Sequence, residues 1–274
     1  MGIFRFKEFD VINERSAMKV NTDGVLLGAV MDIRPDDRSL LDIGTGTGTI
    51  ALMAAQRLDE MFIRSSLTAP QDNECVPEVS HDCHRSGDVI LNEEKNRFSV
   101  KAIDIDEPSA TEAAENFRNS PWSDILQAHN ISLDLFAAQN SDTFDLIFSN
   151  PPYFDNALQA PEVRRNAARH TATGLSYREI LDFAKDRLTE QGRVAMVLPA
   201  DTELDLARHA RMCGLHLYRI TRVRTVTRKV PNRIIAEFSR QRIESPEDVI
   251  LTIQNEGQYT QEYLSLMKDF YLFA

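Results

Sequence analysis

Short apolar runs alternate with amphipathic segments along most of the 274-residue chain. Several of the apolar runs are continuous, which is typical of strands buried on both faces of a parallel sheet. The seven runs lie at 39–43, 98–103, 125–128, 144–149, 193–198, 215–220 and 233–238. Helical patterns lie at 48–58, 107–118, 176–188 and 201–212. This alternation predicts an α/β fold with a doubly wound, mostly parallel seven-stranded sheet.

Three further segments surround or interrupt this core of residues 39–240. Residues 1–38 form an N-terminal lead-in, and residues 241–274 form an extension that we expect to end in an aromatic-rich helix and to pack on the core. Residues 62–97 are polar and lack sustained periodicity, so we predict a flexible surface insertion. The insertion carries Cys75, His81, Cys83 and His84, but their spacing fits no standard zinc pattern, and no metal site is predicted.

The composition narrows the class of protein. No apolar run approaches the roughly 20 residues that span a bilayer, the N-terminus lacks a secretory signal, and three cysteines make no disulfide framework. We therefore expect a cytoplasmic protein without a membrane partner. The net charge of −11 argues against a nucleic-acid partner. However, residues 219–233 carry six basic side chains and no acid, which suits either phosphate binding or an ordinary solvated edge.

A glycine-rich turn, Gly44-Thr45-Gly46-Thr47-Gly48, follows the first predicted strand. Glycine is needed where the backbone takes a positive φ or approaches a ligand closely, and the helix that follows offers free N–H groups. The spacing differs from the G-x-G-x-x-G of dinucleotide enzymes. Asp42, just before the turn, would repel a pyrophosphate. It suits a ligand with an amino group, such as the methionine part of S-adenosylmethionine.

The next strand ends at Asp104, where an acid accepts hydrogen bonds from ribose hydroxyls. Asp106 is better placed to cap the following helix, because Pro108 comes two residues later.

The sequence Asn150-Pro151-Pro152-Tyr153 directly follows the strand at 144–149. Two prolines stiffen the turn and present Asn150 at the carboxyl end of a central strand, where ligands of open α/β sheets bind. An exocyclic amine is a poor nucleophile because its lone pair is delocalised into the ring. The Asn150 side-chain oxygen and the Pro151 carbonyl can each accept one of its N–H groups, which favours a lone pair aimed at the methyl donor. Tyr153 offers a face on which a planar base stacks.

With these motifs in order, the sequence resembles the class I methyltransferases. Within them it is most similar to the bacterial tRNA adenine-N6 methyltransferases that modify adenine 37 of a valine tRNA. The more specific similarities lie at residues 4–7, 18–29, 119–122, 168–170 and 269–272. The resemblance implies S-adenosylmethionine as cofactor, tRNA as partner, no metal and a monomer. It also implies that Arg164, Arg165, Arg169 and the basic run at 219–233 contact tRNA.

The resemblance also assigns site residues. The catalytic residues are Asn150, Pro151, Pro152 and Tyr153. The cofactor residues are Lys19, Asn21, Thr22, Asp23, Asp42, Gly44, Gly46, Gly48, Asp104, Ile105, Ser132 and Asn150. One departure concerns residues 129–132, where relatives often place an aspartate near the cofactor adenine, so that Ser132 or Asn130 has to take its place.

Three alternatives stay open at this point. Protein glutamine methyltransferases share the Asn-Pro-Pro-Tyr turn, but they usually carry a larger helical domain before the glycine turn. Guanine-N2 rRNA methyltransferases have a similar turn. An inert RNA-binding scaffold on the same fold would need neither the glycine turn nor Asn150.

Overall fold

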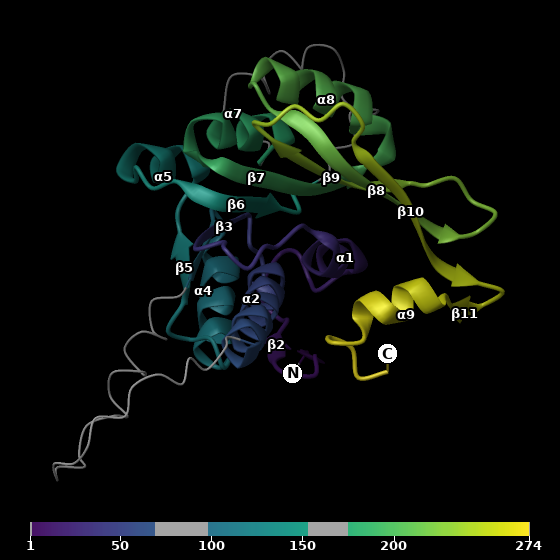
Figure 1. Cartoon of the computed structure of the whole chain (residues 1–274). Coiled ribbons are helices and arrows are strands. Elements are labelled where there is room, and N and C mark those ends of the chain that lie inside the picture. Colours follow the sequence, from purple (N-terminus) through teal and green to yellow (C-terminus); the bar gives the residue numbers. More distant parts are fainter. Residues whose placement is uncertain (1, 69–97, 153–174, 274) are drawn as a thin grey trace, which may run out of the picture.

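The computed structural model describes residues 2–68, 98–152 and 175–273, and its centre is one nine-stranded sheet (Figure 1). The order is β11-β10-β8-β9-β7-β6-β3-β4-β5. All neighbouring pairs from β7 to β5 are parallel, as are β8 and β10, whereas β9 is antiparallel to both of its neighbours. The core strands are β3 (Ser39–Ile43), β4 (Ser99–Asp104), β5 (Leu126–Asn130), β6 (Phe144–Ser149), β7 (Leu188–Pro199), β8 (His216–Val226) and β9 (Arg233–Ser239).

Helices cover both faces of this sheet, which confirms the doubly wound α/β class (Figure 1). One face packs against α1 (Thr22–Val30), α2 (Thr49–Thr68), α4 (Glu107–Arg118) and α9 (Gln261–Met267). The other packs against α5 (Leu133–Gln139), α7 (Tyr177–Arg187) and α8 (Glu203–Met212), with a short 3-10 turn at Ala200–Thr202. In α7 the apolar positions Ile180, Leu181 and Ala184 fall on one buried stripe, as the helical period requires.

The C-terminal segment differs from the expectation of a helix alone. It first forms β10 (Glu247–Asn255), which pairs in parallel with β8, and then β11 (Gln258–Tyr259), before α9 begins. The sheet therefore has nine strands and not seven. Strand β10 was missed because it begins with charged residues and only its middle is apolar. Its conformation depends on tertiary pairing with β8, which the local sequence does not reveal.

The lead-in is also more ordered than its sequence pattern indicated. It contains a two-stranded sheet of β1 (Ile3–Arg5) and β2 (Asp10–Ile12), followed by α1. Arg193 on β7 donates two hydrogen bonds, of 2.9 and 2.7 Å, to the buried carboxylate of Asp37. This buried pair joins the lead-in to the centre of the sheet.

Helix α2 continues to Thr68, so the first part of the predicted insertion is helical. Residues 69–97, with the cysteines and histidines considered above, lie outside the described residues. No helix within the described ranges is both long and apolar enough to cross a bilayer.

Candidate functional site

The glycine turn after β3 has the backbone that the sequence predicts. Gly44, Gly46 and Gly48 take φ values of 72°, 57° and 80°, a region that side chains disfavour. The N–H of Gly44 donates to the carbonyl of Ile103 at 2.9 Å, and the N–H of Gly46 donates to the carboxylate of Asp104 at 2.8 Å. The turn is therefore bonded directly to the end of β4.

Asp42 lies behind the turn and does not line the cavity described below. Its Oδ2 accepts the hydroxyl hydrogen of Thr45 at 2.7 Å, whereas its buried Oδ1 has no partner among the described residues. Burial raises the pKa of Asp42 to about 7, because a carboxylate without water favours its neutral form. The role that the structure gives Asp42 is to hold the turn. The predicted contact with an amino group of the ligand has no support in its position.

Gly48 likewise packs away from the cavity. A Cβ at this position would lie 2.5 Å from Cε1 of Phe117 on α4. Gly48 is thus needed for close packing of the turn against α4, and only Gly44 and Gly46 of the three glycines face the ligand space.

A cavity of about 250 Å³ opens at the carboxyl ends of β3, β4 and β6. Its acidic lining residues are Asp104, Asp106, Asp134 and Glu179, and no Lys, Arg or His side chain is among the described residues that line it. Apolar groups form much of the remaining wall, including Met18, Ile103, Ile105, Ile131, Leu133 and Leu175. An anionic and partly apolar cavity favours a cation with an apolar or aromatic part, and it disfavours a phosphate.

Asp104 occupies the position expected of a ribose ligand. Besides accepting from Gly46, its carboxylate accepts the N–H of Asp106 at 2.9 Å. Burial raises the pKa of Asp104, and the two N–H donors act in the opposite direction. Ile105 follows it with 66% of its surface exposed, which leaves an apolar side chain at the cavity wall.

Ser132 lines the cavity and caps α5 by accepting the N–H of Leu135 at 3.3 Å. Asn130 does not line it. Its side chain donates to the carbonyls of Asp104 and Ile105 at 3.1 Å each, so it fixes the loop after β4. Of the two predicted substitutes for the usual aspartate, only Ser132 is at the cavity. Asp134, two residues later, also lines the cavity and was not predicted, because the sequence pattern indicated no helix at 133–139.

Asn150 and Pro152 line the same cavity from the end of β6. Asn150 is buried, and its amide nitrogen lies 3.5 Å from the Oδ1 of Asn21 and 3.6 Å from the sulfur of Met18. Pro151 is buried beside it. Tyr153 lies outside the described residues.

None of the four predicted cofactor residues of the lead-in lines this cavity. Asn21 caps α1 and touches Asn150, whereas exposed Lys19 donates to the carbonyl of Glu14 at 2.5 Å. Thr22 and Asp23 line a second cavity instead. The residues that the sequence missed, Ala17 and Met18, directly precede the predicted stretch and line the first cavity.

Comparison with known proteins decides the family. The model of the RMKL-like methyltransferase domain matches residues 31–227. A protein of Mannheimia succiniciproducens named tRNA1(Val) (adenine(37)-N6)-methyltransferase is 33% identical over 98% of this chain and 94% of its own length. One of the same name from Parabacteroides distasonis is 35% identical over 98% and 97%. This chain belongs to that family. A solved predicted O-methyltransferase from Agrobacterium tumefaciens, 12% identical with a TM-score of 0.53 over 90% of this chain and 96% of that one, shares the fold.

The family confirms the resemblance drawn from the motifs, and it makes S-adenosylmethionine the cofactor of this methyltransferase. The cavity fits that molecule on its own evidence. Its acids suit the positively charged sulfonium, Asp104 suits the ribose, and Ile105 and Leu133 suit the adenine ring. Gly44 and Gly46 let the backbone approach the ligand, since neither carries a side chain into the space.

The basic run of the methyltransferase is largely paired within the protein. Arg219 contacts the buried carboxylate of Glu237 at 3.1 Å, and Arg222 contacts Glu203 at 2.6 Å and Asp248 at 2.9 Å. Further along, Arg224 donates to the Thr252 hydroxyl at 2.8 Å, and Arg233 pairs with Asp23 at 2.8 Å. Most of this run is therefore structural. Arg164, Arg165 and Arg169 lie outside the described residues.

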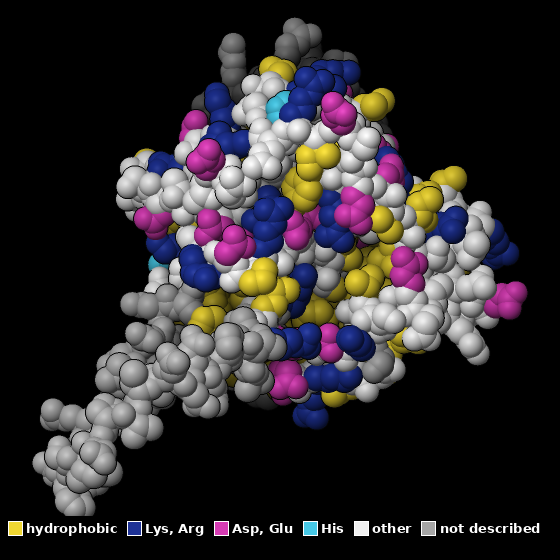
Figure 2. All heavy atoms as spheres, in the orientation of Figure 1, with side chains coloured by type: hydrophobic (Ala, Val, Ile, Leu, Met, Phe, Trp, Pro, Cys, Tyr) yellow, Lys and Arg dark blue, Asp and Glu magenta, His cyan; other side chains and the backbone are white. Residues whose placement is uncertain are grey.

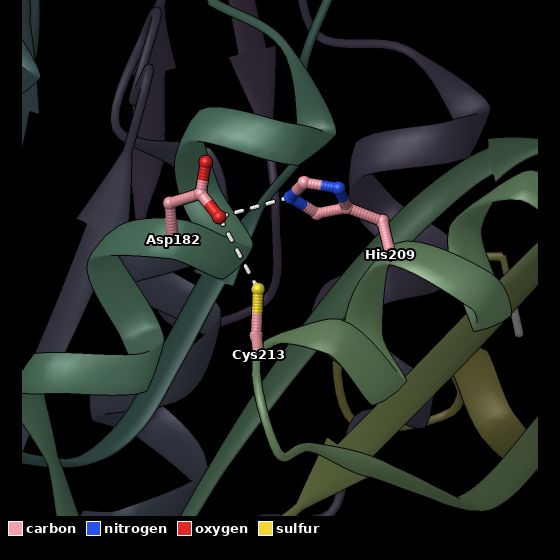
Figure 3. A group of neighbouring side chains, drawn as sticks. All are labelled: Asp182, His209 and Cys213. Atoms are coloured by element: carbon pink, nitrogen blue, oxygen red, sulfur yellow. Dashed lines mark hydrogen bonds and ion pairs between the residues drawn. The ribbon is translucent and has the colours of Figure 1, made fainter.

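A separate cluster, Asp182, His209 and Cys213, joins α7 to α8 (Figure 3). Its three potential metal-binding atoms lie within 4.8 Å of one another. In the structure both neighbours bond to the same oxygen of Asp182, His209 at 2.9 Å and the Cys213 thiol at 3.2 Å. Burial and the adjacent carboxylate raise the pKa of Cys213 to about 11, so the thiol stays protonated and serves as a donor.

Proposed function

We propose that this protein transfers a methyl group from S-adenosylmethionine to the exocyclic N6 of adenine 37 in tRNA1(Val). The observation that carries the proposal is the position of Asn150. It stands at the carboxyl end of β6, on the wall of an anionic cavity whose other side is the glycine turn of β3. The proposed substrate places the reaction in the cytoplasm.

The cofactor supplies a methyl group already activated by a sulfonium, so the protein's task is to orient the acceptor amine. Asn150 and the carbonyl of Pro151 are the proposed acceptors of its two N–H groups. Because neither acceptor ionises near neutral pH, they act by preorganised hydrogen bonding and not as general bases. The new N–C bond would form as the bond between the methyl carbon and the sulfonium sulfur breaks, and the methylated amine would then lose one proton to solvent.

The rest of the site keeps this geometry fixed. The two prolines restrict the backbone directly after Asn150, and Asn21, the cap of α1, contacts the Asn150 side chain. Asn150 is nearly inaccessible to water in the structure, which strengthens any hydrogen bond that it makes to a substrate.

The test is methylation of defined RNAs by the purified protein with labelled cofactor. We expect incorporation into a tRNA1(Val) transcript, located at adenine 37, and none into a transcript with guanine at that position. A transcript with adenine 37 replaced that is still labelled, or labelling of rRNA guanine or of a protein glutamine in its place, would overturn the proposal. Absence of methyl transfer to every substrate, with cofactor binding also absent, would indicate an inert scaffold.

A further inference from the structure

The end of the sheet that holds the cofactor cavity continues along the carboxyl end of β7, the amino end of β9 and the carboxyl ends of β8 and β10. Figure 1 shows the order of these strands. A second cavity of about 300 Å³ opens there, which we call the hairpin groove. Its polar lining residues include Asp23, Thr225, Asn232, Arg233, Gln254 and Tyr259. Asp23 lies two residues beyond Asn21, the residue that contacts Asn150. The groove thus adjoins the catalytic turn on the side away from the glycine turn of β3.

The chemistry of this groove differs from that of the cofactor cavity. Asp23 and Arg233 neutralise each other in a partly exposed pair at 2.8 Å. The amides of Asn232 and Gln254, with the hydroxyls of Thr225 and Tyr259, offer both donors and acceptors. A neutral lining of this kind suits base edges and sugar hydroxyls better than it suits a cation.

Two basic residues lie at the tip of the β8–β9 hairpin, between the groove residues Thr225 and Asn232 in the sequence. Arg228 and Lys229 are exposed there, and no carboxylate of the described residues pairs with either side chain. Val230 follows with 83% of its surface exposed. Basic side chains are visible on this protruding hairpin at the right of Figure 2. Two cations and an exposed apolar side chain on a projecting hairpin suit a phosphate backbone with unstacked bases.

We propose that the hairpin groove and its tip bind the single-stranded RNA that flanks the target base. The inference rests on the proposed function, since it names where the same substrate lies. The arginines earlier in the basic run serve folding, and Arg228 and Lys229 supply the phosphate contacts. With the cofactor on one side of Asn150 and the flanking strand on the other, the target base is delivered between them.

The test compares two double variants with the same change in net charge. Arg228→Glu/Lys229→Glu reverses the tip, and Arg118→Glu/Arg211→Glu reverses two exposed cations on α4 and α8, away from the groove. We expect the tip variant to raise the KM for a tRNA1(Val) transcript about tenfold or more and to reduce the log–log salt slope of binding by about 2, because two phosphate contacts are lost. The control variant should keep both values, and both variants should bind S-adenosylmethionine as the wild type does.

A groove variant tests the neutral lining separately. Gln254→Ala should raise the KM for the transcript without changing the salt slope, since it removes a polar contact and no charge. The inference is overturned if the tip variant and the control variant bind the transcript equally, with equal salt slopes. Binding is measured without turnover, so a wild type that binds the transcript but never methylates adenine 37 would contradict the proposed function alone.

Discussion

The side-chain amide nitrogen of Asn150 lies 3.5 Å from the side-chain oxygen of Asn21. That oxygen also accepts the N–H of Gly24 at 2.9 Å, so the same atom caps α1 and faces the end of β6. Asn21 belongs to the lead-in and Asn150 to the core, 129 positions apart. The lead-in therefore takes part in positioning the proposed catalytic turn.

Asn21→Ala should therefore impair both folding and catalysis. Loss of the cap costs about 1 kcal/mol of unfolding free energy, and it removes one of the contacts that hold the Asn150 side chain in place. We expect kcat to fall while the cofactor Kd stays near its wild-type value. Asn21→Ser restores a cap but is too short to reach Asn150, so it should recover stability and not kcat. Full recovery of kcat in Asn21→Ser would show that the cap alone matters.

Asn150→Ala should remove methyl transfer while leaving cofactor binding nearly intact. Loss of one preorganised acceptor typically lowers kcat about 100-fold or more, and the glycine turn does not depend on this side chain. Calorimetry with S-adenosylmethionine and a single-turnover methylation assay measure the two effects separately. The exposed Asn119→Ala serves as the matched control. Full activity in Asn150→Ala would remove Asn150 from the mechanism.

Asp104→Ala should weaken cofactor binding by about 1–3 kcal/mol, as expected for loss of a hydrogen bond to a charged group. The structure adds a second cause, because the carboxylate also holds the N–H of Gly46 at 2.8 Å. Asp104→Asn keeps an oxygen for one of these bonds, so it should lose less affinity than Asp104→Ala. The Kd values of the two variants, measured by calorimetry, check the order. An unchanged Kd in both would place the ribose contact elsewhere.

The sequence predicted the central sheet and the two turns well, because buried parallel strands are continuously apolar and because glycine and proline restrict the backbone locally. The predicted end of a strand at Ser149 and the predicted start of a helix at Glu107 both match the structure. Helix α1 was missed because it is apolar on all sides, with every residue from Gly24 to Val30 buried, so it shows no amphipathic period.

The site was predicted only in part, because contacts between residues distant in the sequence decide which side chains reach the cavity. Asp42 and Gly48 belong to the glycine motif, but both support the turn instead of lining the cavity. Asp42 accepts a hydrogen bond from Thr45, and Gly48 packs against Phe117. The basic run shows the same limit: a stretch without a nearby acid can still find distant partners, as Arg222 does in Glu203 and Asp248. Charge reversal at Arg222 would therefore break a structural network before it tested RNA binding.

Asp42 should make stability depend on pH. Its pKa is raised from 3.8 to about 7 in the folded protein, so folding takes up a proton between these values. The stabilisation present at low pH is therefore lost as pH rises towards 7, amounting to a few kcal/mol. Asp42→Asn has no carboxyl group that titrates at this position. Its stability relative to the wild type should therefore increase as the pH rises from 3.8 to about 7. Denaturant unfolding at pH 5, 6, 7 and 8 measures the difference, and a constant difference would contradict the buried, raised pKa.

Gly48→Ala should destabilise the protein more than Gly214→Ala, although both positions have a positive φ, of 80° and 72°. At Gly214 a Cβ meets nothing within 4 Å, so only the backbone cost of about 1–2 kcal/mol applies. At Gly48 the Cβ would lie 2.5 Å from the Phe117 ring, which adds about 1–3 kcal/mol of overpacking.

Urea unfolding of the two variants separates strain from steric conflict. Phe117→Leu added to Gly48→Ala should relieve part of the steric cost, so that the double variant loses less stability than the two single losses added together. The same substitution added to Gly214→Ala should be additive, because the two sites share no contact. Equal losses at Gly48 and Gly214, or strict additivity with Phe117→Leu at both, would mean that α4 moves away freely and that Gly48 is required by its backbone alone.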